Sequence, residues 1–324
     1  MVHTMGQATA GAPGSSGLAR VVAFVRLGRP LFLGGGFVLY ALGAAIAAWH
    51  GHAIAVSTYL LGQLVVTALQ LMTHYANDYF DYEADCANLT PTRWSGGSRV
   101  LPGGAVPRRA ALVAALLLAG IGVAAGLRLA AGAAAGVHVI ALVLTILALS
   151  WAYSAPPWRL HSSGLGELDV ALVVTGLVPL LGFTLQAPDG IGLPTLLLAV
   201  APLVCLQLAM LLAIEFPDEK GDRATGKRTL VVRLSPARAV PLYAGITLAA
   251  YAVLPILVVA GLPFPVAAAA AVTAPIAAWR VSRARAGDCL TPARWESLTF
   301  WAVALLVATS AAELAAFVLL LRSN

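Results

Sequence analysis

Long apolar segments recur from Leu31 to the last residues of the chain, and short polar stretches separate them. Each segment is roughly 20 residues long, the length that a helix needs to cross the hydrocarbon core of a bilayer. Hydropathy over windows of about 19 residues predicts spans near residues 31–49, 55–77, 109–127, 132–152, 168–186, 194–215, 240–260, 263–280 and 298–321. The pattern therefore predicts an all-α fold, a polytopic membrane bundle of about nine transmembrane helices.

Composition supports this prediction and excludes a soluble fold. The chain is 60% hydrophobic and only 10% charged, whereas a soluble domain carries about 25% charged residues. Residues 1–20 are mostly small and polar, without the apolar stretch of a secretory signal. We expect a disordered tail over residues 1–20 and a single membrane domain over residues 21–324.

The basic residues predict the orientation of the bundle. If the N-terminus is cytoplasmic, 18 of the 20 Lys and Arg residues fall on the inner face, and only Arg128 and Arg322 fall outside. Short loops rich in Lys and Arg stay in the cytoplasm, so we predict a multi-pass protein of the cell (inner) membrane with its N-terminus inside. This distribution explains the net charge of +6 without a nucleic-acid partner. Nearly all carboxylates also fall on the inner face, so we expect the active site to face the cytoplasm.

An aspartate motif follows the second predicted span. It reads Asn77-Asp78-x-x-Asp81-x-x-x-Asp85. If the helix continues, Asn77, Asp81 and Asp85 share one face, because side chains four residues apart stack on a helix. Carboxylates at this spacing repel each other unless a cation lies between them. A set of ligands made only of oxygen suits Mg²⁺, which takes the rest of its coordination from water and substrate phosphates.

A second motif follows the sixth predicted span, which ends at Glu215. Asp218 and Asp222 repeat the spacing of four, and both motifs emerge at the same face of the membrane. We expect them to oppose each other across the bundle and to hold a diphosphate through Mg²⁺. A single pair of this kind is usually a solvated turn, but two pairs in phase favour a metal site. The predicted metal ligands are Asn77, Asp78, Asp81, Asp85, Asp218 and Asp222, and Asp81, Asp85, Asp218 and Asp222 are the predicted catalytic residues.

Basic residues near both motifs are candidates for phosphate contacts. Lys227 and Arg228 follow the second motif, Arg93 follows the first, and Arg29 precedes the first span. Gly96 and Gly97 would let the backbone approach an anion closely. The predicted substrate-binding residues are Asn77, Arg29, Tyr153, Lys227, Arg228 and Arg93.

At these motifs the chain resembles the UbiA superfamily of membrane prenyltransferases. Further matches are Asp222-Arg-x-x-Gly226-Lys227-Arg228-Thr229-Leu230, Tyr153-Ser-Ala-Pro156-Pro157 and Gly164-Leu-Gly166-Glu167. The resemblance implies a nine-helix bundle and Mg²⁺-dependent transfer of a polyprenyl group from its diphosphate to an aromatic acceptor. The enzyme would lie in the lipid bilayer, because both donor and product are apolar. The ring of Tyr153 is a candidate to face the allylic cation, and an anchor at the membrane interface is the alternative role of this residue.

The acceptor is left open by the sequence. The stretches at Gly164 and Asp222 resemble 1,4-dihydroxy-2-naphthoate polyprenyltransferases of menaquinone synthesis, whereas Tyr153-Ser-Ala-Pro-Pro departs from that branch and Glu215 stands where many relatives have Asn. Another aromatic or lipid acceptor is the alternative, and the prenyl chain length, the oligomeric state and the roles of Glu215 and Cys86 stay open. A carboxylate-lined ion-coupled transporter is the alternative from another class. Transporter sites tend to lie near the midplane, whereas these carboxylates cluster at the inner ends of spans.

Overall fold

The computed structural model describes residues 17–132 and 135–323, and all regular structure within them is helical. Its longer helices are α1 Gly17–Leu27, α2 Pro30–Trp49, α3 Val56–Phe80, α5 Arg108–Gly132, α6 Gly136–Ser154, α9 Leu193–Glu215, α12 Pro236–Ala252, α15 Ala274–Arg285 and α16 Trp295–Ser323. Its shorter helices are α4 Tyr82–Ala87, η1 Leu160–Ser162, α7 Gly166–Val170, η2 Ala171–Leu177, α8 Val178–Thr184, α10 Glu219–Ala224, α11 Leu230–Leu234, α13 Leu254–Val259, α14 Phe264–Ala271, η3 Asp288–Leu290 and η4 Pro292–Arg294.

Nine stretches of helix in the described part of the chain are long and apolar enough to cross a membrane, which confirms the predicted fold. Four of them are composite, because α7, η2 and α8 run on as one span, as do α12 with α13, α14 with α15 and η4 with α16. Pro255 and Pro275 lie at the starts of α13 and α15. A proline removes one backbone donor and clashes with the preceding turn, so it interrupts a helix without ending the span.

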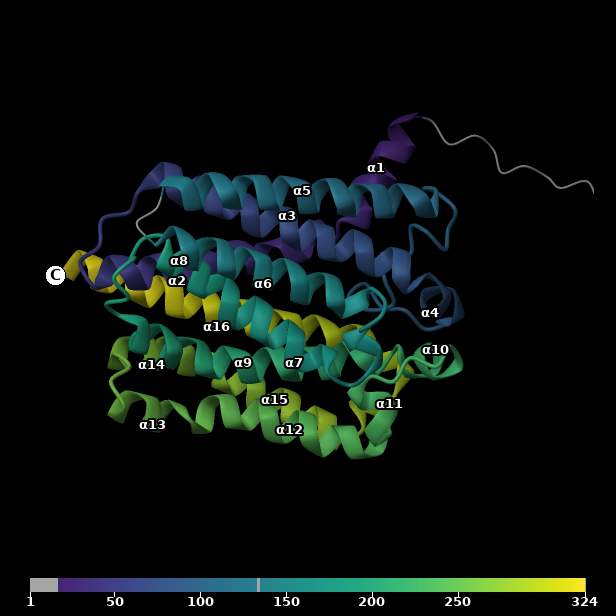
Figure 1. Ribbon diagram of the computed structural model, residues 1–324. Coiled ribbons are helices and arrows are strands. Elements are labelled where there is room, and N and C mark those ends of the chain that lie inside the picture. The colour runs from purple at the N-terminus through teal and green to yellow at the C-terminus, as the bar shows by residue number, and fades with distance from the viewer. Residues whose placement is uncertain (1–16, 133–134, 324) are drawn as a thin grey trace, which may run out of the picture.

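Most of the predicted tail, residues 1–16, lies outside the described residues. Residues 17–20, which the sequence analysis assigned to the tail, form the first turn of α1. In Figure 1 this helix projects from the bundle near the end that carries α4 and α10.

Close helix packing in the bundle depends on small residues. Where α2 crosses α8, a Cβ added to Gly43 would overlap the backbone at Pro179, and one added to Gly182 would overlap the backbone at Tyr40. Glycine at both positions allows the two backbones to touch, as is common between membrane helices. This contact draws the span that contains α7 and η2 against α2 in the middle of the bundle.

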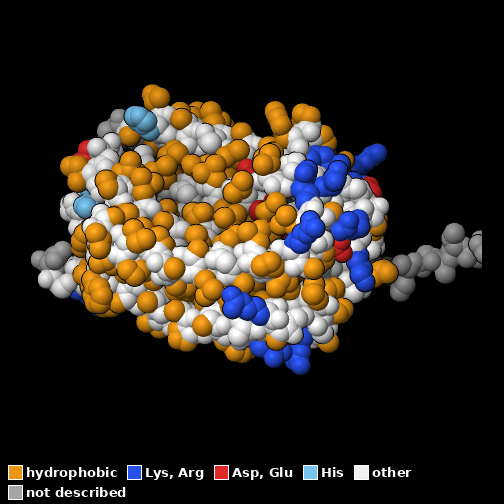
Figure 2. Space-filling view, turned by 90° about the horizontal axis from the view of Figure 1, so that it is seen from below, with side chains coloured by type: hydrophobic (Ala, Val, Ile, Leu, Met, Phe, Trp, Pro, Cys, Tyr) orange, Lys and Arg blue, Asp and Glu red, His pale blue; other side chains and the backbone are white. Residues whose placement is uncertain are grey.

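Two surfaces of the molecule differ in chemistry. The short helices α4, α10 and α11 lie together at one end of the bundle (Figure 1), and Lys and Arg side chains gather mostly toward that end, while apolar side chains cover the flanks (Figure 2). Both aspartate motifs belong to this end, because α4 and α10 carry them. The fold therefore brings together two motifs that are 137 residues apart in the sequence.

Candidate active site

The first aspartate motif crosses a junction between two helices. Asp81 ends α3 and precedes α4, so the helix does not run through the motif unbroken. The helical register nevertheless continues, because Asp81 N donates to Asn77 O at 2.8 Å and Asp85 N donates to Asp81 O at 2.9 Å. Asn77, Asp81 and Asp85 consequently line one cavity, as their spacing predicts.

Asp78 belongs to the same motif but lies away from that cavity. Its buried carboxylate accepts hydrogen bonds from the Arg29 guanidinium and from the Ser98 hydroxyl. Arg29 also donates to Asn77 Oδ1 at 3.0 Å and lines the cavity itself. In this structure Asp78 therefore holds Arg29 and the loop at Ser98 in place, and its predicted role as a metal ligand stays a prediction.

The second motif follows α9 and faces the first. Asp222 N donates to Asp218 O at 2.9 Å, and both carboxylates line the same cavity as Asp81 and Asp85. Asp218 accepts hydrogen bonds from Asn88 Nδ2 at 2.7 Å and from Gly96 N at 3.0 Å. The loop after the first motif thus holds a carboxylate of the second.

Lys227 joins the two motifs. Its Nζ lies 2.8 Å from Asp81 Oδ2 and 3.5 Å from Asp222 Oδ1. Asp81 also pairs with Nε2 of the buried His161. Burial favours the neutral form of Asp81, but Lys227 and His161 outweigh it, so the pKa of Asp81 lies well below its usual value.

The other three aspartates of the cavity have less positive charge close to them than Asp81 has, and their pKa values are raised. Burial raises the pKa of Asp85 to about 8, and burial with the neighbouring Asp222 raises the pKa of Asp218 to about 7. The pKa of Asp222 is also raised, first by burial, despite the nearby Lys227. The cavity has a volume of about 80 Å³, and its charged lining residues are Arg29, Lys227, Asp81, Asp85, Glu167, Glu215, Asp218 and Asp222. Carboxylates outnumber the lysine and arginine, so the cavity is suited to a cation.

The residues present fit Mg²⁺ as an ion shared with a substrate. Asp85 Oδ2 is buried without a hydrogen-bond partner, which leaves an oxygen donor free. Within the described residues, no three His, Cys, Asp or Glu side chains form a ready cage for a metal. Mg²⁺ commonly uses one or two carboxylates and completes its coordination with water and phosphate oxygens, so an open set of carboxylates is adequate.

The predicted substrate-binding residues separate into two groups. Asn77, Arg29, Tyr153 and Lys227 line the cavity. The side chains of Arg93 and Arg228 are exposed and do not line it, so a diphosphate contact from either stays a prediction that would require these side chains to reorient.

Four residues of the cavity lining have roles that the sequence did not predict. His161 and Asn88 belong to no recognisable spacing, yet they bond Asp81 and Asp218. Glu167 and Glu215 accept hydrogen bonds from Leu230 N at 2.7 Å and Val231 N at 3.3 Å. These two carboxylates thereby anchor the segment that follows Lys227, and the motif containing Glu167 was the only indication of this role.

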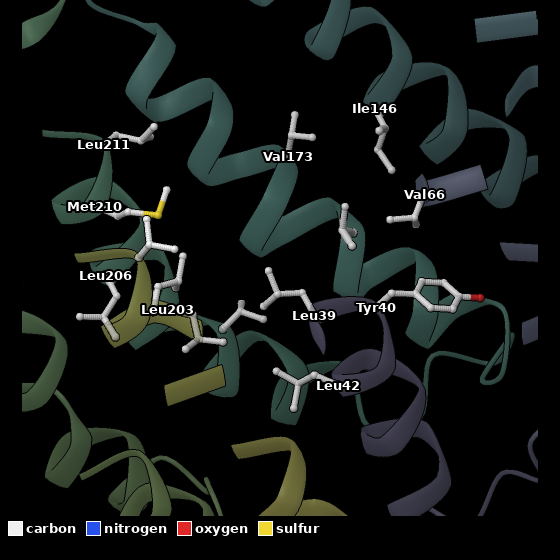
Figure 3. Packing of buried hydrophobic residues seen from close by; sticks show 14 of the residues in the cluster. Leu39, Tyr40, Leu42, Val66, Ile146, Val173, Leu203, Leu206, Met210 and Leu211 are labelled. Atoms are coloured by element: carbon white, nitrogen blue, oxygen red, sulfur yellow. The ribbon is translucent and has the colours of Figure 1, made fainter. Parts of the chain in front are cut away.

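An apolar chamber of about 210 Å³ adjoins the acidic cavity. The two share Arg29, Asn77, Tyr153, Leu211 and Ile214 in their linings. Figure 3 shows its side chains from α2, α3, α6, η2 and α9 pointing toward one another, among them Leu39, Val66, Ile146, Val173, Met210 and Leu211. A charged head group and an apolar tail can thus occupy adjoining spaces.

A membrane bundle with two facing aspartate motifs beside an apolar chamber defines an intramembrane enzyme that acts on lipid-like substrates. The chain belongs to the UbiA prenyltransferase family, whose model matches residues 37–303. A 1,4-dihydroxy-2-naphthoate octaprenyltransferase from Mycobacterium tuberculosis is 32% identical over 231 residues, which cover 71% of this chain and 75% of that protein. A digeranylgeranylglyceryl phosphate synthase from Thermococcus gammatolerans is 31% identical over 196 residues, which cover 56% of this chain and 64% of that protein.

Solved structures share the fold. A UbiA homolog from Archaeoglobus fulgidus bound to DMAPP and Mg²⁺ superposes with a TM-score of 0.59 at 14% identity, over 93% of this chain and 99% of that one. The same homolog was also solved with GPP and Mg²⁺. Prenyl diphosphates and Mg²⁺ are therefore bound together in a protein of this fold.

Gly97 gives a test of how tightly the site is built. Its φ is +72°, and an added Cβ would overlap the Asp85 carboxylate. We expect Gly97→Ala to displace Asp85 and to lower prenyl transfer at least about tenfold, because a small misplacement of a group in the site is enough to slow the reaction by that factor. The left-handed backbone costs ~1 kcal/mol or more for any residue with a Cβ, so a control must carry the same strain. The matched control is Gly104→Ala, where φ is +68° but nothing lies within 4 Å of the added Cβ. Equal losses of activity in the two variants would show that backbone strain alone is responsible.

Proposed function

We propose that this protein transfers a polyprenyl group from its diphosphate to an aromatic acceptor in a Mg²⁺-dependent reaction, with 1,4-dihydroxy-2-naphthoate as the leading acceptor. One observation carries the proposal: both aspartate pairs line a cavity that shares five lining residues with an apolar chamber. The diphosphate would lie among the carboxylates and Lys227, and the prenyl tail would enter the chamber.

The residues that would hold Mg²⁺ are Asn77, Asp81, Asp85, Asp218 and Asp222. When bound, the ion would supply positive charge that stabilises the departing diphosphate. Lys227 and Arg29, which both line the cavity, would donate hydrogen bonds to the same leaving group. The C–O bond of the allylic diphosphate breaks with its electron pair on diphosphate, and a π electron pair of the acceptor ring forms the new C–C bond. The ring then regains its aromaticity by losing the group that the prenyl carbon replaces, either a proton to water or a carboxylate as CO₂.

Water must be kept from the allylic carbon while this exchange takes place. The chamber beyond Tyr153 and Ile214 is lined mainly by apolar side chains, so it would shield the reactive carbon. The aromatic ring of Tyr153, which lies 5.4 Å from the ring of His161 between centroids, is placed where the two cavities meet and would face the cation.

Curated relatives support two kinds of acceptor. The 1,4-dihydroxy-2-naphthoate octaprenyltransferase shares more of its length with this chain than the digeranylgeranylglyceryl phosphate synthase does. This favours a naphthoate acceptor and a place in menaquinone synthesis. The distribution of Lys and Arg favours the cell (inner) membrane, with the acidic cavity toward the cytoplasm.

Single-turnover release of diphosphate tests the proposal. Purified protein would be mixed with labelled geranylgeranyl diphosphate and longer donors, with 1,4-dihydroxy-2-naphthoate, in the presence and absence of Mg²⁺. We expect prenylated product only with Mg²⁺. Ionisation of the donor without that product would support prenyl transfer but would show that 1,4-dihydroxy-2-naphthoate is not the acceptor. No Mg²⁺-dependent ionisation with any acceptor, together with ion flux in vesicles, would favour a transporter instead.

A further inference from the structure

Asp169 is a buried carboxylate that faces the apolar chamber without a partner. Its side chain lines the chamber, the residue is only 7% exposed, and its Oδ1 is buried with no hydrogen bond. No ion pair joins it to any Lys, Arg or His of the described residues. The one lysine or arginine in the chamber lining is Arg29, whose guanidinium is already bonded to Asn77 and Asp78.

Such a carboxylate is costly beside a hydrocarbon tail. Burying a polar group without a hydrogen bond destabilises a fold, and burying an unpaired charge does so more strongly. Ionisable side chains within a membrane are functional by default for this reason. An isoprenoid tail has no hydrogen-bond donor, so a tail against Asp169 would leave that cost uncompensated. The molecule beside Asp169 must therefore bring an O–H or N–H group.

Asp169 also lies close to the reacting end of the chamber. It is three residues along from Gly166, which lines the acidic cavity, and this separation is roughly 4.5 Å along a helix. The span changes to the π-helical stretch η2, Ala171–Leu177, two residues after Asp169. π-Helical insertions often occur at functional sites. Two further polar side chains, Ser150 and Gln207, line the same chamber and are buried.

We propose that Asp169 binds the acceptor substrate by accepting a hydrogen bond from its hydroxyl group, so that the acceptor is a hydroxyarene. The inference rests on the proposed prenyl transfer and narrows its acceptor. A phosphate-bearing acceptor fits this chamber less well, because a phosphate carries more negative charge than the single carboxylate of 1,4-dihydroxy-2-naphthoate, and Arg29, the one Lys or Arg of the lining, is already paired with Asp78. The 4-hydroxyl of the naphthoate is two ring bonds away from the carbon that bears the carboxylate, so it can meet Asp169 while the carboxylate points away. The bound hydroxyl would hold the ring next to the carbon that leaves the diphosphate.

Acceptor binding and turnover, measured separately, test this role. The probes are 1,4-dihydroxy-2-naphthoate and its two monomethyl ethers, each of which removes one hydroxyl donor. Equilibrium binding would be followed by the fluorescence of the naphthoate, and KM would be determined for acceptor and donor. A hydrogen bond to a charged group contributes enough to change affinity by about 10- to 100-fold. We expect wild type to prefer the dihydroxy compound to one of the ethers by about that factor.

Asp169→Leu should lose this preference. Its acceptor KM should rise by the same 10- to 100-fold, while the KM of geranylgeranyl diphosphate changes less than about twofold. Asp169→Asn keeps a carbonyl oxygen that can accept a hydrogen bond, so its acceptor KM should lie between those of wild type and Asp169→Leu. Val173→Ala is the matched control, because Val173 lines the chamber one turn further along the same span. It alters the space but should retain the preference for the free hydroxyl.

Three results would overturn the inference. One is a wild-type enzyme that binds the ethers as well as the dihydroxy compound. Another is an equal loss of donor and acceptor affinity in Asp169→Leu, which would make Asp169 a structural residue. The third is preferred transfer to a glycerol phosphate, unchanged by Asp169→Leu. In that case Mg²⁺-dependent ionisation of the donor would persist, and the proposed prenyl transfer would stand without the role of Asp169. If wild type showed no Mg²⁺-dependent ionisation of the donor at all, the proposed function itself would be rejected.

Discussion

Asp81→Ala should slow Mg²⁺-dependent release of diphosphate at least about a thousand-fold, the largest effect of any single substitution in the cavity. Removing one group that stabilises developing charge typically costs about 10²–10³ in rate, and Asp81 has further partners. Its carboxylate bonds Lys227, His161 and Asn77. Without it the buried His161 loses its partner, and Lys227 retains only the longer contact with Asp222.

The measurement is single-turnover diphosphate release from labelled geranylgeranyl diphosphate at saturating Mg²⁺. Glu83→Gln is the matched control, since Glu83 belongs to α4 but its side chain is 63% exposed and pairs with Arg108. This control should retain the wild-type rate within about twofold. A rate for Asp81→Ala within tenfold of wild type would contradict the assignment of Asp81 to the metal and diphosphate site.

Lys227→Met should lower the same rate about 100-fold and raise the KM of the donor. Methionine keeps most of the side-chain volume but removes the charge that bridges the two motifs. Burial opposes the charged form of Lys227, but Asp81 and Asp222 raise its pKa well above the usual value, so it remains a cation at working pH. Loss of this cation leaves two buried carboxylates opposed and removes a hydrogen-bond donor for phosphate.

Lys220→Met is the control for Lys227, because Lys220 lies in α10 near Asp222 but is exposed and does not line the cavity. Thermal unfolding of both variants separates a general loss of stability from a loss of donor binding. If Lys220→Met and Lys227→Met reduced activity equally, the effect of Lys227 on the rate would come from the overall positive charge at this end of the bundle and not from its position in the cavity.

The sequence was sufficient to predict the fold class and to select the Asn and Asp side chains of the two motifs that line the cavity. Within a bilayer, backbone polar groups must be satisfied inside each segment, so apolar length alone predicts the spans from α2 to α16. Residues four apart share a helical face, so the spacing of four predicts which side chains of each motif point the same way. In the first motif this holds even across the junction of two helices at Asp81. These are local relations, and local relations can be read from the order of residues.

Contacts between distant segments needed the tertiary structure. Lys227 and Arg228 are adjacent and carry the same charge, yet only Lys227 lines the cavity, since the segment held by Glu167 and Glu215 turns Arg228 outward into an exposed position. His161 shows the same dependence, because it is 80 residues from Asp81 and meets it only when the helices pack.

By itself, then, the sequence determined the helical membrane bundle, the end of the bundle at which most charged residues lie, and the helical spacing that points the aspartates of each motif the same way. The tertiary structure alone decided which cation neutralises Asp81, that Gly96 and Gly97 approach carboxylates of the protein, and that Asp169 faces an apolar chamber. The physical reason is that hydropathy and helical periodicity act within a segment. Charge compensation and burial depend on which segments the packing of small residues brings together.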